Sequence, residues 1–155
     1  MSDTVPGKSP VRRRIGRRPK DIGTDGERWV VEYLRANGWP GAERRALHGR
    51  DDRGDITGTV GLAWEVKSGH KAKSAGPKEI ATWLDQALIE ATNAGAELGI
   101  LVTARSGYGR ARVGMWHVHM PLDYVAGARA DLGAVTMTLE TACRWLRWLG
   151  YGEPL

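Results

Sequence analysis

The strongest constraint on the fold is a pair of short strand-like segments that one glycine separates. Asp55–Val60 and Leu62–Ser68 have the length and the residue types of strands. Gly61 lies between them, where a tight turn favours glycine. The sequence therefore predicts a β-hairpin in this part of the chain.

The segments on either side of the hairpin predict helices and further strands. Thr24–Glu27 fits the capping-box pattern at the start of a helix that ends at Asn37–Gly38. Pro77 suits the first turn of a second helix, which reaches about Asn93. Leu98–Val102 is a near-continuous apolar run, typical of a strand that is covered on both faces. The shorter elements expected are strands at 42–47, 113–120 and 134–137, a basic loop at 69–76, and helices at 124–131 and 138–149. The order of these elements indicates an α/β fold with a central mixed β-sheet flanked by helices.

The positive charge of the chain is concentrated near its start. The net charge is +5, and residues 1–20 hold seven basic side chains against one acidic side chain. The rest of the chain carries 16 basic and 17 acidic side chains, so its net charge is −1. We expect residues 1–22 to form a flexible basic arm and residues 23–155 to form one domain.

A basic arm on a near-neutral domain suits a polyanion such as DNA, because each neutralised phosphate releases counterions. The alternative is a solvated terminus without a specific role. The candidate DNA contacts in the arm are Arg12, Arg13, Arg14, Arg17 and Arg18.

Composition also excludes several functional classes. No stretch approaches the roughly 20 apolar residues that span a bilayer, and the first twenty residues lack the apolar region of a signal peptide. Cys143 is the single cysteine, which excludes an internal disulfide and a cysteine-based zinc cluster. Gly107–Arg110 does not resemble a nucleotide-binding motif. We therefore expect a cytoplasmic protein with no membrane partner and no nucleotide cofactor.

Charged residues interrupt the apolar pattern of the hairpin. Alternate side chains of a strand share a face, so Glu65 and Lys67 are expected on one face and Trp64 on the other. A glutamate and a lysine on an otherwise apolar strand are costly to bury unless they are paired. Asp55 begins the neighbouring strand and can meet Glu65 across the hairpin. Two carboxylates and one ammonium group are therefore expected to converge.

This set of groups fits the hydrolysis of a phosphodiester bond. Magnesium prefers oxygen ligands and is often held by one or two carboxylates. Asp55 and Glu65 would supply these, the backbone carbonyl of Val66 and waters would complete the shell, and Mn²⁺ is the expected substitute. Lys67 would orient or activate the attacking water and stabilise the transition state. The alternative is a cross-strand ion pair on a solvated face, worth about 0–1 kcal/mol.

A wider set of residues resembles the PD-(D/E)xK nuclease superfamily, in particular the archaeal-type Holliday junction resolvases and their phage relatives. Gly54 stands where the motif has its proline, a departure that is frequent in the superfamily. The resemblance covers about Thr24 to Val102 and leaves out the arm and residues 121–155. The matching positions are Gly26-Glu27, Gly38, Arg45, Gly54-Asp55-Ile56, Trp64-Glu65-Val66-Lys67-Ser68 and Gln86.

The resemblance implies a restriction-endonuclease-like core and roles for further residues. Glu27 in the first helix would help to hold the metal or the water; its alternative role is the reciprocal acid of the capping box. Arg45 would lie near the substrate phosphate. Gln86 would support the active site, although its helical position equally fits a solvent-facing side chain. Lys71 and Lys73 follow the second strand of the hairpin and are expected to contact the DNA backbone.

The resemblance further implies a magnesium-dependent endonuclease that cuts branched DNA, such as a four-way junction, in recombination and repair. Paired cuts in a two-fold junction would require a homodimer. The expected setting is the cytoplasm of a bacterium or of a phage-infected cell. Two alternatives stay open: a nuclease of the same superfamily acting on linear duplex or single-stranded DNA, and a non-catalytic DNA-binding module.

His117 and His119 share one face of a predicted strand and are the remaining candidate metal ligands. The nearby sequence offers Asp123 but no further cysteine or histidine, which disfavours a zinc site. We therefore expect both to be ordinary exposed histidines.

Overall fold

The described strands form one six-stranded sheet. The computed structural model describes residues 16, 18–46, 53–127 and 132–155. The strand order is β1-β2-β3-β4-β5-β6; within it β3 and β4 run parallel, and the other neighbouring pairs are antiparallel. This confirms the predicted α/β fold with a mixed sheet packed against helices. The elements are α1 (Pro19–Ala36), β1 (Glu43–Arg44), β2 (Ile56–Thr57), β3 (Leu62–Lys67), α2 (His70–Lys73), α3 (Pro77–Asn93), β4 (Leu98–Thr103), the 3₁₀ helix η1 (Arg110–Met115), β5 (His117–Pro121), α4 (Leu122–Ala126), β6 (Ala134–Thr138) and α5 (Leu139–Trp148).

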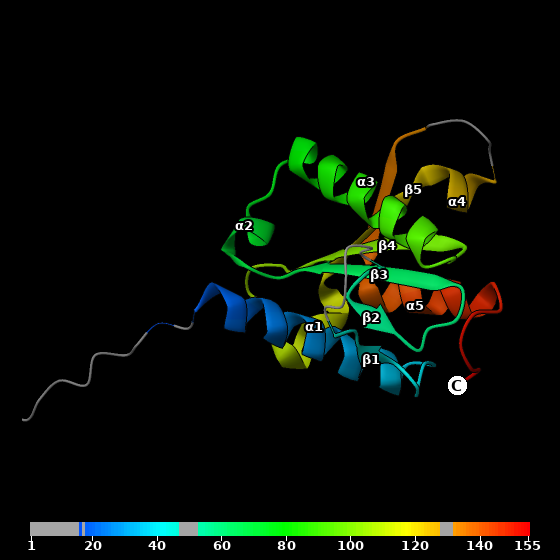
Figure 1. Cartoon of the computed structure of the whole chain (residues 1–155), viewed down its shortest axis with the longest axis horizontal. Coiled ribbons are helices and arrows are strands. Elements are labelled where there is room, and N and C mark those ends of the chain that lie inside the picture. The colour runs from blue at the N-terminus through cyan, green and yellow to red at the C-terminus, as the bar shows by residue number, and fades with distance from the viewer. Residues whose placement is uncertain (1–15, 17, 47–52, 128–131) are drawn as a thin grey trace, which may run out of the picture.

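Helices cover both faces of the sheet, but they cover them unequally. In Figure 1, α1 and α5 lie on one side of the sheet and α3 lies on the other. The side of α1 and α5 holds the main core, which includes Val30, Leu34, Trp64, Ile100 and Leu146. The α3 side buries a smaller group, formed by Leu84, Ala87 and Leu101. The layer formed by α3 and the sheet face beneath it is therefore the thinner of the two.

The connection from β3 through α3 to β4 determines which residues meet at one end of the sheet. The parallel register places Lys67 beside Thr103, so both strands end at the same edge. Gly99 lets α3 pack closely on β4, because a Cβ atom there would lie 2.8 Å from the Ala87 carbonyl oxygen. A larger residue at position 99 would push the helix away from the strand.

Most predicted elements are confirmed, and the first helix shows the largest difference. α3 spans Pro77–Asn93, as the sequence predicts. α1 begins at Pro19 rather than at Thr24, so the predicted capping box is wrong and Thr24–Glu27 lies within the helix. Proline favours the first position of a helix, where its missing N–H is not needed. Residues 19–22 thus belong to α1 and not to a flexible arm.

The shorter elements differ from the prediction in length and, at two places, in type. β1 and β2 are two residues long each, and the chain turns at Gly58 and Gly61, whose φ angles are 76° and 80°. The segment predicted as a basic loop contains α2. The predicted strand at 113–120 begins as η1, and β5 starts at His117. Within the described ranges, the helices are all too short or too polar to cross a membrane.

Candidate active site

Asp55, Glu65 and Lys67 converge at the junction of β2 and β3. Ile56 pairs with Trp64 in the antiparallel register, which places Asp55 opposite Glu65. The Lys67 Nζ atom lies 2.6 Å from Glu65 Oε1. The Val66 N–H donates to Asp55 Oδ2 at 2.7 Å. The side chains predicted to share a face therefore do meet, while Trp64 lies in the main core on the opposite face.

Partial burial gives the cluster unusual electrostatics. Glu65 is 5% exposed and the Lys67 side chain is 27% exposed. Burial, reinforced by the charge of Glu65, raises the pKa of Asp55 to about 8, although the Val66 N–H bond acts in the opposite direction. Burial alone would lower the pKa of Lys67, but its hydrogen bond to Glu65 and nearby negative charge raise it above the usual value. At neutral pH Lys67 is therefore charged, and burial favours the protonated form of Asp55.

Glu90 is a further carboxylate of this region that sequence reasoning missed. Its side chain is 2% exposed on α3, and its charge contributes to the raised pKa of Lys67. Glu90 follows Trp83 by seven residues and Ala87 by three, which is the spacing of one helix face. This spacing was the one indication in the sequence that Glu90 lies on the same face of α3 as Trp83 and Ala87. The carboxyl groups of Asp55, Glu65 and Glu90 surround a single ammonium group, and a bound cation would balance the excess negative charge.

Two neighbours restrict the position of the Lys67 ammonium group. Its Nζ atom lies 6.0 Å from the centre of the Trp83 ring, within reach of a cation–π interaction. Thr103 stands beside Lys67 on β4. The lysine is thus flanked by α3, by β4 and by its ion pair with Glu65, and part of it stays accessible to a substrate.

The donor set fits a cation that is held by two carboxylates. Among the described residues, no group of three or more His, Cys, Asp or Glu side chains is placed to hold a metal ion. Magnesium is commonly held by one or two carboxylates with waters completing its shell, and Asp55 and Glu65 supply that number. Burial first, and then the charge of Glu65, raises the pKa of Asp55 although Lys67 acts in the opposite direction, and a bound cation would offset both causes. The site therefore suits Mg²⁺ or Mn²⁺ and lacks the larger ligand set typical of zinc.

Glu27 lies close enough to influence Asp55, but Arg44 holds its carboxylate. Arg44 donates from Nε at 2.9 Å and from Nη2 at 2.7 Å to Glu27 Oε2. The charge of Glu27 is one of the causes that raise the pKa of Asp55. Its alternative role as the acid of a capping box is wrong, because α1 begins earlier. Its assistance to a metal or a water stays a prediction.

Arg45 lies beside the cluster through its backbone. Its N–H donates to the Asp55 carbonyl oxygen at 2.8 Å, so its backbone lies beside the cluster. Its side chain instead lines a cavity of about 230 Å³ with residues 57–62 and 94–96, near the start of β3. Lys67 lies at the opposite end of that strand. The predicted contact of Arg45 with the reacting phosphate stays a prediction.

The structure describes only some of the other predicted support and DNA-binding residues. Gln86 is exposed on α3, so its support of the active site stays a prediction. Lys71 forms a 2.6 Å ion pair with Glu79, whereas Lys73 is exposed and lines a separate cavity. Arg18 is exposed immediately before α1. The remaining arm residues lie outside the described residues: Arg12, Arg13, Arg14 and Arg17.

His119 is buried, which corrects the expectation of two exposed histidines. Its side chain lies in β5 between two strands, with Nε2 2.9 Å from Thr103 Oγ1 and Nδ1 2.8 Å from Thr136 Oγ1. Burial, followed by the charge of His117, lowers the pKa of His119 to about 4. Both ring nitrogens are thus engaged by hydroxyl groups, which is a structural role and not that of a zinc ligand.

No known protein family, curated protein or solved structure matches the chain. The chemistry of Asp55, Glu65 and Lys67 is therefore what indicates a function. These groups lie at the end of an ordered strand, where Lys67 is partly accessible.

Proposed function

We propose that the chain is a magnesium-dependent DNA endonuclease in which Asp55 and Glu65 hold the cation and Lys67 acts at the attacking water. The observation that carries this proposal is the meeting of the three side chains across β2 and β3, with Lys67 Nζ 2.6 Å from Glu65 Oε1. A solvated ion pair would not explain the burial of Glu65, which is 5% exposed. The concentration of basic residues before α1 adds an affinity for a polyanionic substrate.

The electrostatics of the cluster assign a role to each side chain. When bound, Mg²⁺ supplies charge neutralisation at the phosphate and a water of lowered pKa. Asp55 and Glu65 would hold the cation, and Asp55, whose pKa is raised to about 8, would bind it in its ionised form. The raised pKa of Lys67 keeps it charged at neutral pH. Lys67 therefore orients the water and stabilises negative charge in the transition state, and it is a poor general base.

The proposed substrate is branched DNA such as a four-way junction, cut by a homodimer in the cytoplasm of a bacterial or phage-infected cell. A nuclease for linear duplex or single-stranded DNA would use the same catalytic residues. A non-catalytic DNA-binding module is favoured by one observation, the short Glu65–Lys67 ion pair, which by itself needs no cation.

A cleavage panel tests the proposal and separates these alternatives. Purified full-length chain is incubated with Mg²⁺ and with end-labelled junction, flap, duplex and single-stranded DNA. Asp55→Asn, Glu65→Gln and Lys67→Ala are each expected to lower the rate by about 100-fold or more, because each removes a group that acts in the transition state.

Matched controls lie on the exposed face of α5, where Glu140→Gln and Arg144→Ala change the same kinds of charge. Both are expected to cut at the parental rate. Parental cutting by all three cluster variants would refute the catalytic assignment. DNA binding without Mg²⁺-dependent cutting would select the binding module.

A further inference from the structure

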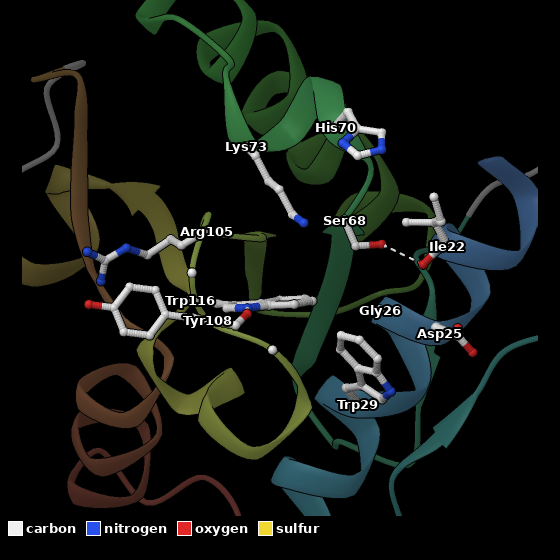
Figure 2. A pocket seen from close by; sticks show the side chains of 12 residues that line it. Ile22, Asp25, Gly26, Trp29, Ser68, His70, Lys73, Arg105, Tyr108 and Trp116 are labelled. Carbon is white, nitrogen blue, oxygen red and sulfur yellow. Dashed lines mark hydrogen bonds between the residues drawn. The ribbon is translucent and has the colours of Figure 1, made fainter. Parts of the chain in front are cut away.

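A cavity of about 300 Å³ lies at the end of β3, on the sheet face opposite Asp55, Glu65 and Lys67, which together form the acid–lysine cluster. Residues of α1, of α2 and of the loop that follows β4 surround it (Figure 2). Ser68 forms part of its wall and directly follows Lys67 in the chain. The cavity and the cluster therefore flank the same strand end.

Aromatic rings form one part of the lining. Trp29 of α1 and Trp116 contact each other, with ring centres 6.0 Å apart and planes inclined by 55°. Trp116 is buried, whereas Trp29 is partly exposed. Tyr108 is already engaged, because the guanidinium groups of Arg105 and Arg112 each lie 4.5 Å from its ring centre. The tryptophans therefore supply the aromatic surface that a ligand can contact.

Basic side chains form the other part of the lining. Lys73 extends from α2 into the cavity in Figure 2, and His70 and Arg105 also line it. Asp25 is the acidic member of the lining, and Arg28 lies 3.7 Å from its carboxylate. The cavity thus offers positive charge beside an aromatic wall.

The walls are held in place by contacts within the protein. Ser68 Oγ donates to the Ile22 carbonyl oxygen at 3.1 Å, which joins the end of β3 to α1. The Trp116 Nε1 group donates to the Tyr108 carbonyl oxygen at 2.7 Å. Arg105 Nη1 donates to the Met115 carbonyl oxygen at 2.9 Å. A ligand would therefore meet a preorganised site, which lowers the entropic cost of binding.

We propose that this cavity binds the base of an unpaired DNA nucleotide and that Lys73 contacts the adjacent phosphate. A phosphate alone would leave the tryptophan wall unused, and an apolar ligand would leave the cations unused. A nucleotide satisfies both, since bases stack on aromatic side chains and phosphates pair with lysine. A volume of about 300 Å³ is at the lower end of the range of small-ligand sites, so it admits one nucleotide and excludes a duplex.

This inference rests on the proposed function and narrows its substrate class. A strand whose unpaired base enters the cavity passes the end of β3, where Lys67 lies. The protein would thereby favour DNA in which a nucleotide is unpaired next to a paired region. Extracting a base is least costly where the base is already unpaired.

Binding in EDTA tests the inference without requiring cleavage. Three short duplexes are compared: one fully paired, one with a single-nucleotide bulge, and one in which the bulged nucleotide is abasic. The bulge that carries its base is expected to bind about 10-fold more tightly than the abasic bulge, because stacking of one base contributes this order of affinity. Equal affinity for the two bulges would overturn the proposal.

Variants of residues that line the cavity test whether the preference for the base arises there. Trp29→Leu is expected to abolish the preference for the base, and Trp29→Phe to retain it, because a phenyl ring preserves an aromatic surface. Lys73→Ala is expected to weaken binding of both bulged duplexes, and Arg144→Ala on α5 to leave the affinities unchanged. Thermal unfolding shows whether each variant is folded, and the comparison of the two bulges by the parent chain needs no variant. A base preference that survives in folded Trp29→Leu would overturn the assignment to this cavity.

The two proposals fail separately. Cleavage that depends on Glu65, without a preference for the base, would overturn the cavity proposal and support the nuclease. A base preference in EDTA that Trp29→Leu removes would support the cavity proposal, even if no DNA substrate is cut.

Discussion

At the scale of single residues, alternation along β3 predicted the core of the site. The period-two pattern is local, so Glu65 and Lys67 could be placed on one face and Trp64 on the other without knowledge of the fold. Glu90 was missed because its contribution depends on how α3 lies over the sheet. The pairing of Glu27 with Arg44 was missed for the same reason, because it depends on the tertiary contact between α1 and β1.

Asp55 leads to a prediction about stability and pH in EDTA. In the unfolded chain its carboxyl group ionises near its ordinary pKa of 3.8, whereas in the folded chain its pKa is about 8. Between these values the unfolded chain binds fewer protons, so this residue makes the free energy of unfolding fall as pH rises. Asp55→Asn retains an acceptor for the Val66 N–H and removes the titration. We expect its Tm to exceed that of the parent at pH 8 by a few degrees, with a smaller difference at pH 5.

Magnesium provides the control for this experiment. A ligand that binds the folded state raises its stability, so Mg²⁺ should raise the Tm of the parent at pH 8. Asp55→Asn lacks one of the proposed ligands and should respond less. Differential scanning calorimetry at both pH values measures the effect. A parent Tm that rises with pH as much as that of the variant would show that the Asp55 carboxyl is not perturbed as proposed.

At the scale of elements, long periodic segments were predictable and short ones were not. α3 was predicted with its observed bounds, because Pro77 marks its start and its apolar positions recur over several turns. The two-residue strands β1 and β2 are defined by their pairing across the sheet, which local sequence does not encode. The start of α1 was misplaced because Thr24 offered a plausible cap inside a helix that Pro19 already begins.

Two glycines of α1 give opposite predictions. A Cβ atom at Gly26 would lie 2.1 Å from Ser68 Oγ and 2.2 Å from Ser68 Cβ, whereas Gly23 has no such neighbour within 4 Å. Gly26→Ala should therefore destabilise the protein by about 1–3 kcal/mol through overpacking. Gly23→Ala should stabilise it by about 0.5–1 kcal/mol, because alanine is the better helix former. Urea unfolding of both variants measures the difference, and equal effects of the two substitutions would contradict the close contact of α1 with the end of β3.

At the scale of the whole molecule, the residues that form the main core and the residues proposed for catalysis lie in different layers. The larger core under α1 and α5 lies on the face of the sheet opposite the acid–lysine cluster. The thinner layer under α3 leaves Lys67 partly exposed, although Glu65 beside it is buried. A charged site can thus be placed on the sheet without interrupting the main core. The cavity beside Trp116 lies on the main-core side and extends the candidate surface around the end of β3.

The separation of charge along the chain leads to a prediction for the arm. Residues 1–17 include Lys8, Arg12, Arg13, Arg14 and Arg17, and their removal leaves α1 intact because that helix begins at Pro19. Each phosphate contact contributes about 0.9 to the slope of log affinity against log salt concentration. If these five residues contact phosphates, deletion of 1–17 should flatten this slope by up to about 4.5 and weaken binding most at low salt. Fluorescence anisotropy over a salt series measures both, with Arg144→Ala as the control for loss of one surface charge. An unchanged slope in the deletion variant would place the DNA-binding surface entirely on the folded domain.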